Sequence, residues 1–214
     1  MKNTIVTSCL ILMFTFSMVT LLHGAKEEDV LAEIEKNLNS IETLSVEYTQ
    51  KVNSGVFATI DSTGGKIFLA SGDRFRIESD RQTIVSDSVV LWVYSEENRQ
   101  VRIDSVKNVD DLVKPSDYLF SFKKDYVADL LIEDSCDFGE CFQVLLKSRQ
   151  DDNFIKEMKL YIDSKTHLTR RAEYTDINGN LVTIRFDKYM LNKKLPSQLF
   201  EFNTPKGVEE IRLP

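Results

Sequence analysis

The stretch from Gly65 to Asp104 constrains the fold more than any other part of the chain, because apolar and polar residues alternate within it. Ile67 and Leu69, and then Phe75 and Ile77, stand at every second position. Alternation with this period is typical of strands that have one dry face and one wet face. Gly-Asp and Ser-Asp pairs, together with a Thr-Gly pair just before the stretch, mark turns. The pattern therefore predicts four short antiparallel strands in a row.

Residues 89–94, Val-Val-Leu-Trp-Val-Tyr, are apolar without interruption. A strand with this composition is typically covered on both of its faces. Val101 and Ile103 form the last strand of the stretch, with Arg102 facing out. The rest of the chain is then expected to pack on, extend or cover this antiparallel sheet.

Further strands are predicted on both sides of this stretch, and Asn178-Gly179 is the strongest hairpin signal among them. The fold class is mainly β with some α. About ten or eleven antiparallel strands form a large curved sheet or incomplete barrel, closed by helical segments. The further strands are expected at residues 44–51, 56–60, 129–133, 142–148, 157–163, 169–175 and 181–188, with a last short strand at Phe200 and Phe202.

Two segments have helical rather than alternating patterns. Residues 26–41 place apolar side chains on one helical face and acids in the first turn, where they suit the helix dipole. Residues 109–126 contain apolar residues without strand alternation, and Pro115 suits a first helical turn, so we expect a short helical segment with one apolar face. The apolar residues of the second segment are Val113, Tyr118, Leu119, Phe120 and Phe122.

The first 25 residues differ from the remainder. Lys2 is their only charge, an apolar run covers residues 5–22, and Gly24 and Ala25 follow as small residues. This pattern predicts a secretory signal peptide over residues 1–25, and an uncleaved membrane anchor is the alternative. We expect residues 26–214 to form a single domain, because no repeat or linker divides them.

Cys136 and Cys141 remain after such cleavage, with Gly139 between them. In an exported chain, cysteines close in sequence tend to form disulfides. We therefore predict a Cys136–Cys141 disulfide that closes a hairpin loop. A redox site is the alternative, but the redox motif is C-x-x-C, and here four residues separate the cysteines.

Several function classes are disfavoured by what the chain contains. Its net charge is −7, and nucleic-acid phosphates require a basic surface. His167 is the single histidine after residue 25, which is too few for a common zinc set. We find none of the common catalytic motifs. We expect no enzyme activity, no cofactor or metal, and a monomer; the apolar content predicts either an ordinary core or an unfilled cavity under a curved sheet.

A series of short segments follows in a characteristic order over residues 28–212. They are Tyr48-Thr49-Gln50, Gly65-Lys66-Ile67-Phe68-Leu69, Arg74-Phe75-Arg76-Ile77, Ile84-Val85-Ser86-Asp87, Leu91-Trp92-Val93-Tyr94, Gln100-Val101, Asp176-Ile177-Asn178-Gly179-Asn180 and Phe200-Glu201-Phe202 with Pro205-Lys206-Gly207-Val208. Each segment is short, but their order and spacing together resemble the LolA family of periplasmic lipoprotein carriers.

The resemblance implies an incomplete antiparallel barrel whose apolar cavity holds lipoprotein acyl chains. It implies a periplasmic carrier that takes lipoproteins from an inner-membrane exporter complex to an outer-membrane acceptor. Segment 109–126 becomes a candidate lid, through Val113, Tyr118, Leu119 and Phe122. The candidate cavity residues are Ile67, Leu69, Phe75, Ile77, Leu91 and Val93.

One departure from the family pattern concerns gating. Members carry an Arg-Pro pair after the strand that matches residues 65–69, and that arginine is tied to lid closure and release. Ser71 and Gly72 stand at the matching positions here, so this gating arginine does not carry over. Arg74 and Arg76 are near, but alternation places them on the face opposite to Phe75.

Two other functions fit the same fold. An outer-membrane acceptor would need a lipidation cysteine after the apolar run, and Cys9 stands too early for that role. An envelope sensor or interaction domain would bind a partner protein without carrying lipid, and it is the main alternative to a carrier.

Overall fold

The computed structural model describes residues 28–108, 115, 119, 126–150 and 155–212. The predicted signal peptide over residues 1–25 lies outside these residues. Val113, Tyr118 and Phe122 of the candidate lid lie outside them as well.

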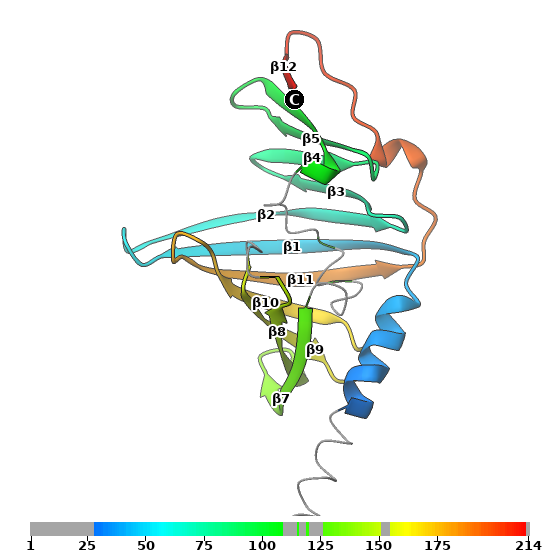
Figure 1. The fold of residues 1–214 in the computed structure, drawn as a ribbon, viewed down its shortest axis with the longest axis vertical. Coiled ribbons are helices and arrows are strands. Elements are labelled where there is room, and N and C mark those ends of the chain that lie inside the picture. Colours follow the sequence, from blue (N-terminus) through cyan, green and yellow to red (C-terminus); the bar gives the residue numbers. More distant parts are fainter. Residues whose placement is uncertain (1–27, 109–114, 116–118, 120–125, 151–154, 213–214) are drawn as a thin grey trace, which may run out of the picture.

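A single sheet dominates the described part of the chain, and it contains twelve strands (Figure 1). Their order is β12-β6-β5-β4-β3-β2-β1-β11-β10-β9-β8-β7, so the sheet has two ends and is not closed. The strands are β1 (Thr43–Ser54), β2 (Thr59–Ala70), β3 (Arg74–Ser79), β4 (Gln82–Ser86), β5 (Val90–Ser95), β6 (Gln100–Ser105), β7 (Tyr126–Cys136), β8 (Gly139–Ser148), β9 (Glu157–Asp163), β10 (Thr169–Thr175), β11 (Leu181–Leu191) and β12 (Glu209–Arg212).

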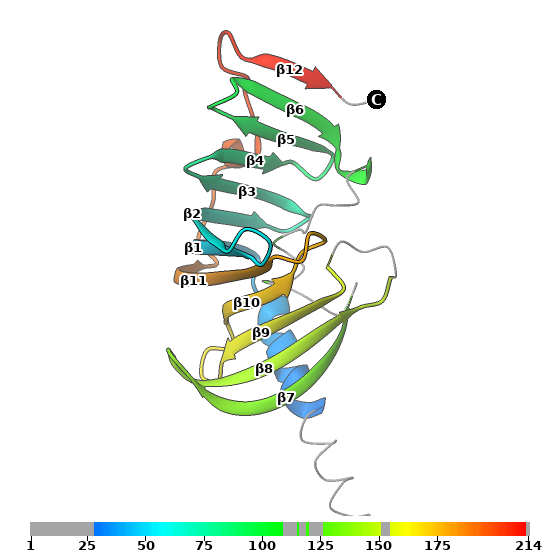
Figure 2. The same ribbon diagram turned by 90° about the vertical axis from the view of Figure 1, so that its left-hand side faces the viewer.

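The predicted class, mainly β in an incomplete antiparallel barrel, is confirmed. Strand neighbours pair antiparallel throughout the sheet except β6 and β12, which are parallel. The sheet consists of two sequential meanders, β1–β6 and β7–β11, and the pairing of β1 with β11 joins them. Figure 2 shows the resulting twist and the curl of β7–β9.

Within the described residues, the α-helix of more than one turn covers residues 28–39, inside the range predicted from its apolar stripe, and a 3-10 helix, η1 (Val106–Asn108), follows β6. Ile34 and Leu38 are fully buried and belong to the main apolar core. Asn37 Nδ2 donates a 2.8 Å hydrogen bond to the Thr166 carbonyl in the β9–β10 turn. The helix therefore packs beside β8–β10, as Figures 1 and 2 show.

The predicted turn at Thr63-Gly64 is wrong, because β2 continues through it. Glycine suits this strand interior because β3 approaches closely. A Cβ at Gly65 would overlap the backbone carbonyl oxygen of Glu78. Gly65 therefore marks a close approach between two strands rather than a turn.

The chain also forms strands where none was predicted. β4 (Gln82–Ser86) was missed, and the sheet has twelve strands rather than the predicted ten or eleven. The separate strand expected at residues 56–60 is wrong, because residues 55–58 form the β1–β2 turn and β2 runs from Thr59 to Ala70. The expected last strand at Phe200 and Phe202 is wrong, since residues 197–200 form a 3-10 helix, η2 (Ser197–Phe200). Strand β12 instead lies in the tail that follows Gly207.

Candidate functional site

The two faces of the sheet differ, and we call the face that carries the main apolar core the inner face. Strand register aligns five apolar residues across it, from β1 to β5. We call this set the central row. Its members are Val46, Ile67, Ile77, Ile84 and Val93.

Exposure rises along the central row. Val46 and Ile67 are 1% and 2% exposed, whereas Ile77, Ile84 and Val93 are only partly buried against the core. The next residue across the sheet is Arg102 on β6, paired with Val93 and exposed. The inner face is therefore apolar up to β5 and becomes charged at β6.

A second row, on the side nearer the beginning of β1, is packed more tightly. It runs from Leu44 through Leu69, Phe75 and Ser86 to Leu91. Each of these residues is at most 1% exposed. This row is core, and it supports the central row from one side.

The row on the opposite side is polar. Tyr48 on β1 lies across Gly65 on β2, and Ser79 on β3 follows. Burial raises the pKa of the Tyr48 phenol, and the nearby Ser79 side chain partly offsets that rise. A ring and a hydroxyl therefore bound the apolar surface on this side.

The six candidate cavity residues lie on the same inner face. Ile67, Leu69, Phe75 and Leu91 are buried within the main core, while Ile77 and Val93 are partly buried. Ile84 occupies the same row but was not among the candidates. Its neighbours Thr83 and Val85 leave the facing of β4 undecided from sequence, and only the register with Ile77 settles it.

Of the four candidate lid residues, the structure describes Leu119. It is 1% exposed and belongs to the main core, and its N–H donates to the Pro115 carbonyl at 3.0 Å. A residue of segment 109–126 thus contributes to the same core as the inner face. Val113, Tyr118 and Phe122 lie outside the described residues.

The outer face of β4–β6 carries a smaller apolar cluster, in which Val85, Val101 and Ile103 are buried. The strand register shows that these side chains point to the face opposite to that of Ile77 and Val93. Val101 and Ile103 are therefore on the other face from the candidate cavity residues. Odd-numbered residues thus face inward on β5 but outward on β6, so the alternation of the sequence changes phase at the β5–β6 turn.

Residues 197–205, which we call the strap, run alongside β1–β5 (Figure 1) and contact this outer face. The Phe202 ring lies 5.5 Å from the Tyr94 ring, and the Phe200 ring lies 5.5 Å from the Arg74 guanidinium carbon. Arg76 Nη1 donates to the Leu199 carbonyl at 3.5 Å. The strap gives the apolar strand β5 its second cover, as its composition predicted.

Comparison with known proteins agrees with this architecture. The family model described as outer membrane lipoprotein carrier protein LolA matches residues 39–203. The chain belongs to the LolA family. An outer-membrane lipoprotein carrier protein from Legionella pneumophila is 26% identical over 95% of this chain and 97% of its own length. One from Pasteurella multocida is 28% identical over 92% of this chain and 95% of its own length.

A solved structure of an uncharacterized conserved protein from Thermus thermophilus has a similar fold. Its TM-score is 0.57 at 15% identity, and the match covers 87% of this chain and 98% of that chain. The likeness therefore extends over nearly the whole fold.

The position of the family's Arg-Pro pair is a turn in this LolA-family chain. Ser71 N donates to the Glu42 carbonyl at 3.1 Å, and Gly72 has a φ of 79°. Arg74 and Arg76 face outward, as alternation predicted, and both contact the strap. These two arginines therefore hold the strap rather than point into the inner face.

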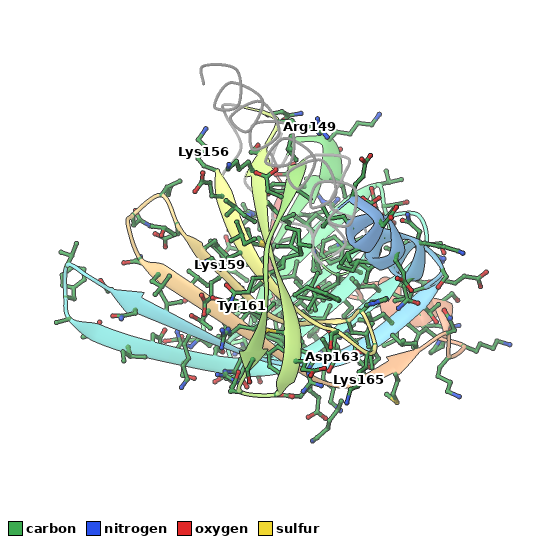
Figure 3. The ribbon with its side chains drawn as sticks, turned by 90° about the horizontal axis from the view of Figure 1, so that it is seen from below. Arg149, Lys156, Lys159, Tyr161, Asp163 and Lys165 are labelled. Atoms are coloured by element: carbon green, nitrogen blue, oxygen red, sulfur yellow. A yellow bond between two sulfur atoms is a disulfide. The ribbon has the colours of Figure 1, made fainter. Side chains whose placement is uncertain are left out.

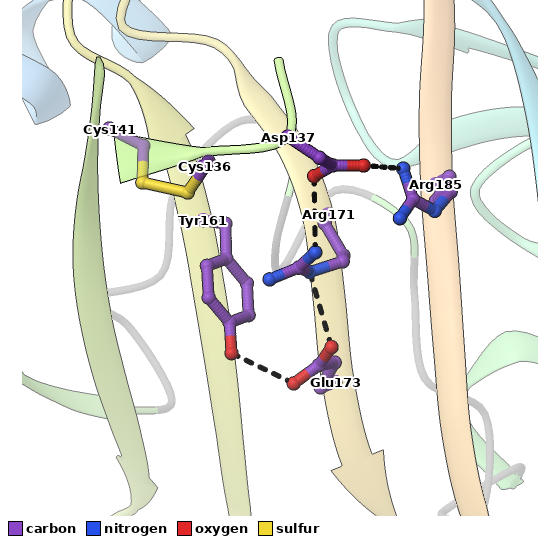
Figure 4. Close-up of a disulfide and its surroundings, with 7 residues drawn as sticks. All are labelled: Cys136, Asp137, Cys141, Tyr161, Arg171, Glu173 and Arg185. Atoms are coloured by element: carbon purple, nitrogen blue, oxygen red, sulfur yellow. Dashed lines mark hydrogen bonds and ion pairs between the residues drawn. A yellow bond between two sulfur atoms is a disulfide. The ribbon is translucent and has the colours of Figure 1, made fainter. Parts of the chain in front are cut away.

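The predicted disulfide is present between Cys136 and Cys141, whose Cα atoms are 5.9 Å apart. It closes the β7–β8 hairpin, and the loop places Asp137 between two arginines (Figure 4). Arg185 donates to one carboxylate oxygen of Asp137, and Arg171 donates to the other at 3.2 Å. The Arg185 hydrogen bond, above all, lowers the pKa of Asp137.

The same network continues along the outer face of the LolA-family sheet. The Arg171 guanidinium carbon lies 3.7 Å from the Tyr161 ring centroid, and the Tyr161 hydroxyl donates to Glu173 at 2.9 Å. Burial raises the pKa of Tyr161. Arg171 Nε also lies 3.1 Å from Glu173 Oε1, so these contacts link the outer faces of β9 and β10.

Metal ligands do not gather anywhere in the described ranges, where no group of three or more His, Cys, Asp or Glu side chains could hold an ion. Within those same ranges, the structure contains no helix with the length and apolar character needed to cross a bilayer.

Proposed function

We propose that this chain is a periplasmic carrier that holds lipoprotein acyl chains against the inner face of its sheet. The central row carries the proposal. Ile77, Ile84 and Val93 form a continuous apolar surface that the core leaves partly exposed. Family membership supports it, since the named relatives are outer-membrane lipoprotein carriers.

The energetics of acyl-chain burial favour such a surface. Each buried CH₂ group contributes about 0.8 kcal/mol, so one long acyl chain supplies a large gross affinity. A carrier must also release its cargo, so part of that gain has to offset an opening step. We propose that segment 109–126 acts as the lid, because its Leu119 is packed in the main core.

The cellular setting is part of the proposal. A signal peptide over residues 1–25 would deliver the carrier to the periplasm. There it would receive lipoproteins from an inner-membrane exporter complex and pass them to an outer-membrane acceptor. The role requires binding and release without covalent chemistry, which agrees with the lack of catalytic motifs in the sequence.

The experiment replaces apolar residues of the central row by glutamate. Phe75 is fully buried, so a charge there would unfold the chain without testing binding. Ile77→Glu and Val93→Glu are better choices because both positions are partly exposed, and Arg102 beside Val93 offers a counter-charge. We expect both variants to fold and to lose lipoprotein capture from inner-membrane vesicles.

Thr49→Glu is the matched control. Thr49 is exposed on the outer face of β1, opposite Arg185 on β11. It adds the same charge to the same sheet, and capture should remain. Normal capture by folded Ile77→Glu and Val93→Glu would reject the inner face as the binding surface.

The sensor or interaction domain remains the second candidate. It predicts a stable complex with a partner protein and no transfer of lipoprotein between membranes. The relatives named as carriers favour transport over this alternative.

A further inference from the structure

Two neighbouring hairpins end in exposed apolar residues. Val56 and Phe57 in the β1–β2 turn are each 77% exposed, and Ile60 at the start of β2 is 70% exposed. Ile177 in the β10–β11 turn is 71% exposed, and Leu181 at the start of β11 is 47% exposed. We call these five residues the apolar tip.

The two hairpins lie side by side. Asn53 on β1 pairs with Ile60 on one side and with Leu181 on the other. Ile60 and Leu181 therefore flank one residue on the same face of three adjacent strands. Figures 1 and 3 show both hairpins projecting from the same side of the sheet, away from the N-terminal helix.

The apolar tip is also free of charge in a chain that is 29% charged. Neither residues 52–60 nor residues 177–184 contain Asp, Glu, Lys or Arg. The nearest acids have partners. Asp61 forms a bidentate pair with Arg81, with contacts of 2.5 and 2.6 Å. Asp176 accepts hydrogen bonds from the backbone of Asn178 and Asn180, each at 2.9 Å.

We propose that the apolar tip inserts shallowly into the interfacial region of a lipid bilayer. Five side chains at two convex turns are too small a surface for a stable protein interface, which buries about 800 Å² on each partner. Shallow membrane binding needs less, because it scales with the apolar area that enters the interface. The strands behind the turns pair with one another, so entry leaves few backbone groups unsatisfied.

The neutral tip sets the lipid preference. An acidic chain is repelled by anionic lipid, but an uncharged tip needs no basic lipid-binding patch. The tip therefore binds a zwitterionic bilayer, and its binding does not weaken with added salt. This contact goes beyond the carrier function, because it requires neither an acyl-chain cargo nor the central row.

The test measures co-flotation of the full chain with phosphatidylcholine vesicles that contain no protein. The double variant Val56→Ser, Phe57→Ser removes two side chains that contribute nothing to the core. We expect wild-type protein to float with the vesicles and the double variant to lose at least about tenfold in partitioning. Circular dichroism should be unchanged.

Val89→Ser and Met190→Ser are the matched controls, because these residues are 67% and 55% exposed but lie outside the apolar tip. Both should float as wild type does. Equal losses in all variants, or no flotation of wild type, would overturn the proposal. So would a wild-type dimer, detected by light scattering, that the double variant abolishes while flotation is unaffected.

Lipoprotein capture separates this proposal from the carrier function. The double variant should still capture detergent-solubilised lipoprotein, since its central row is intact. Ile77→Glu should show the reverse, with normal flotation and no capture. A tip variant that floats normally but fails to capture would place cargo, rather than membrane, at the apolar tip.

Discussion

Strands β8–β10 and strands β3–β5 belong to one sheet but are buried in different ways. In β8–β10 the apolar residues face inward toward the N-terminal helix, and the outer face carries charged pairs. In β4 and β5 both faces carry apolar residues, and the strap lies against the outer face, where it contacts Arg74 and Arg76 of β3 and Tyr94 of β5. Strands of the same sheet can thus bury apolar residues on one face or on both faces, depending on which distant segment packs against them.

The difference has a cause in the sequence. β9 alternates Met158, Leu160 and Ile162 with polar residues, so a single cover is enough. β5 is apolar throughout, and an outer face bearing Trp92 and Tyr94 would otherwise stay in water. Phe202 at the far end of the chain supplies the missing partner. Composition of a strand therefore predicts how many covers it needs, but not where they come from.

The largest expected effect comes from removing a side chain of the inner core. Phe75→Ala deletes a fully buried ring on β3 and leaves a cavity. The free energy of unfolding should fall by about 3–5 kcal/mol. Denaturant unfolding measures this loss, and a loss below about 1 kcal/mol would mean that the inner face of β3 is not close-packed.

Phe200→Ala is the counterpart on the outer face. Phe200 is also buried, at 3% exposed, but it belongs to the strap rather than to the sheet. Its loss should be smaller, because the strap can rearrange over the surface. Hydrogen exchange should accelerate at β3–β5, which the strap contacts, while β8–β10 stay protected; equal acceleration throughout would contradict the separation of the two covers.

Gly65→Ala tests the close approach of β2 and β3. A Cβ at this position would overlap the Glu78 carbonyl, so the strands must separate, at a cost of about 1–3 kcal/mol. Gly64→Ala is the control. A Cβ there would lie 3.4 Å from its nearest atom, the Tyr48 carbonyl oxygen. Thermal unfolding of the two variants should therefore differ, and equal destabilisation would contradict the register.

The smallest effect concerns the charged outer face of the β7–β11 meander. Asp137 has a folded-state pKa below its ordinary value of 3.8, because Arg185 and Arg171 stabilise the carboxylate. Its contribution to stability is complete above that ordinary pKa and is lost as pH falls through the lower, folded-state value. Asp137→Asn should cost less than about 1 kcal/mol at neutral pH, since Asp137 and its main partner Arg185 are both exposed.

Thermal unfolding of wild type and Asp137→Asn across the acidic range checks this prediction. The two melting curves should converge at the acidic end. A difference that persists there would show that Asp137 acts through its loop geometry rather than its charge.

Sequence reasoning predicted the parts of the fold that local patterns control. The helix, the curved antiparallel sheet, the disulfide and the two-sided character of β5 all follow from periodicity or spacing. That Phe75 and Ile77 point to the same face of the sheet followed from alternation within one strand. These features depend on residues a few positions apart, where the period of a strand or helix and the spacing of two cysteines determine the structure.

The failures lie where a distant segment decides. The Thr63-Gly64 turn is absent because β3 approaches Gly65, and the strand expected at Phe200 is absent because its ring packs on the outer face instead. Val101 and Ile103 changed face because the β5–β6 turn reset the alternation. The sequence does not show which face of the sheet Ile84 points to, since its neighbours Thr83 and Val85 can lie on either the buried or the exposed face.

The pairing of β1 with β11 also has a kinetic meaning. Within each meander, neighbouring strands are joined by short turns, and their contacts close small loops. Tyr48 and Phe186, by contrast, pair across most of the chain. Closing that long loop costs conformational entropy before its contacts are formed, which slows folding. The two meanders should therefore form early, and the Cys136–Cys141 bond can close inside its own hairpin before β1 and β11 meet.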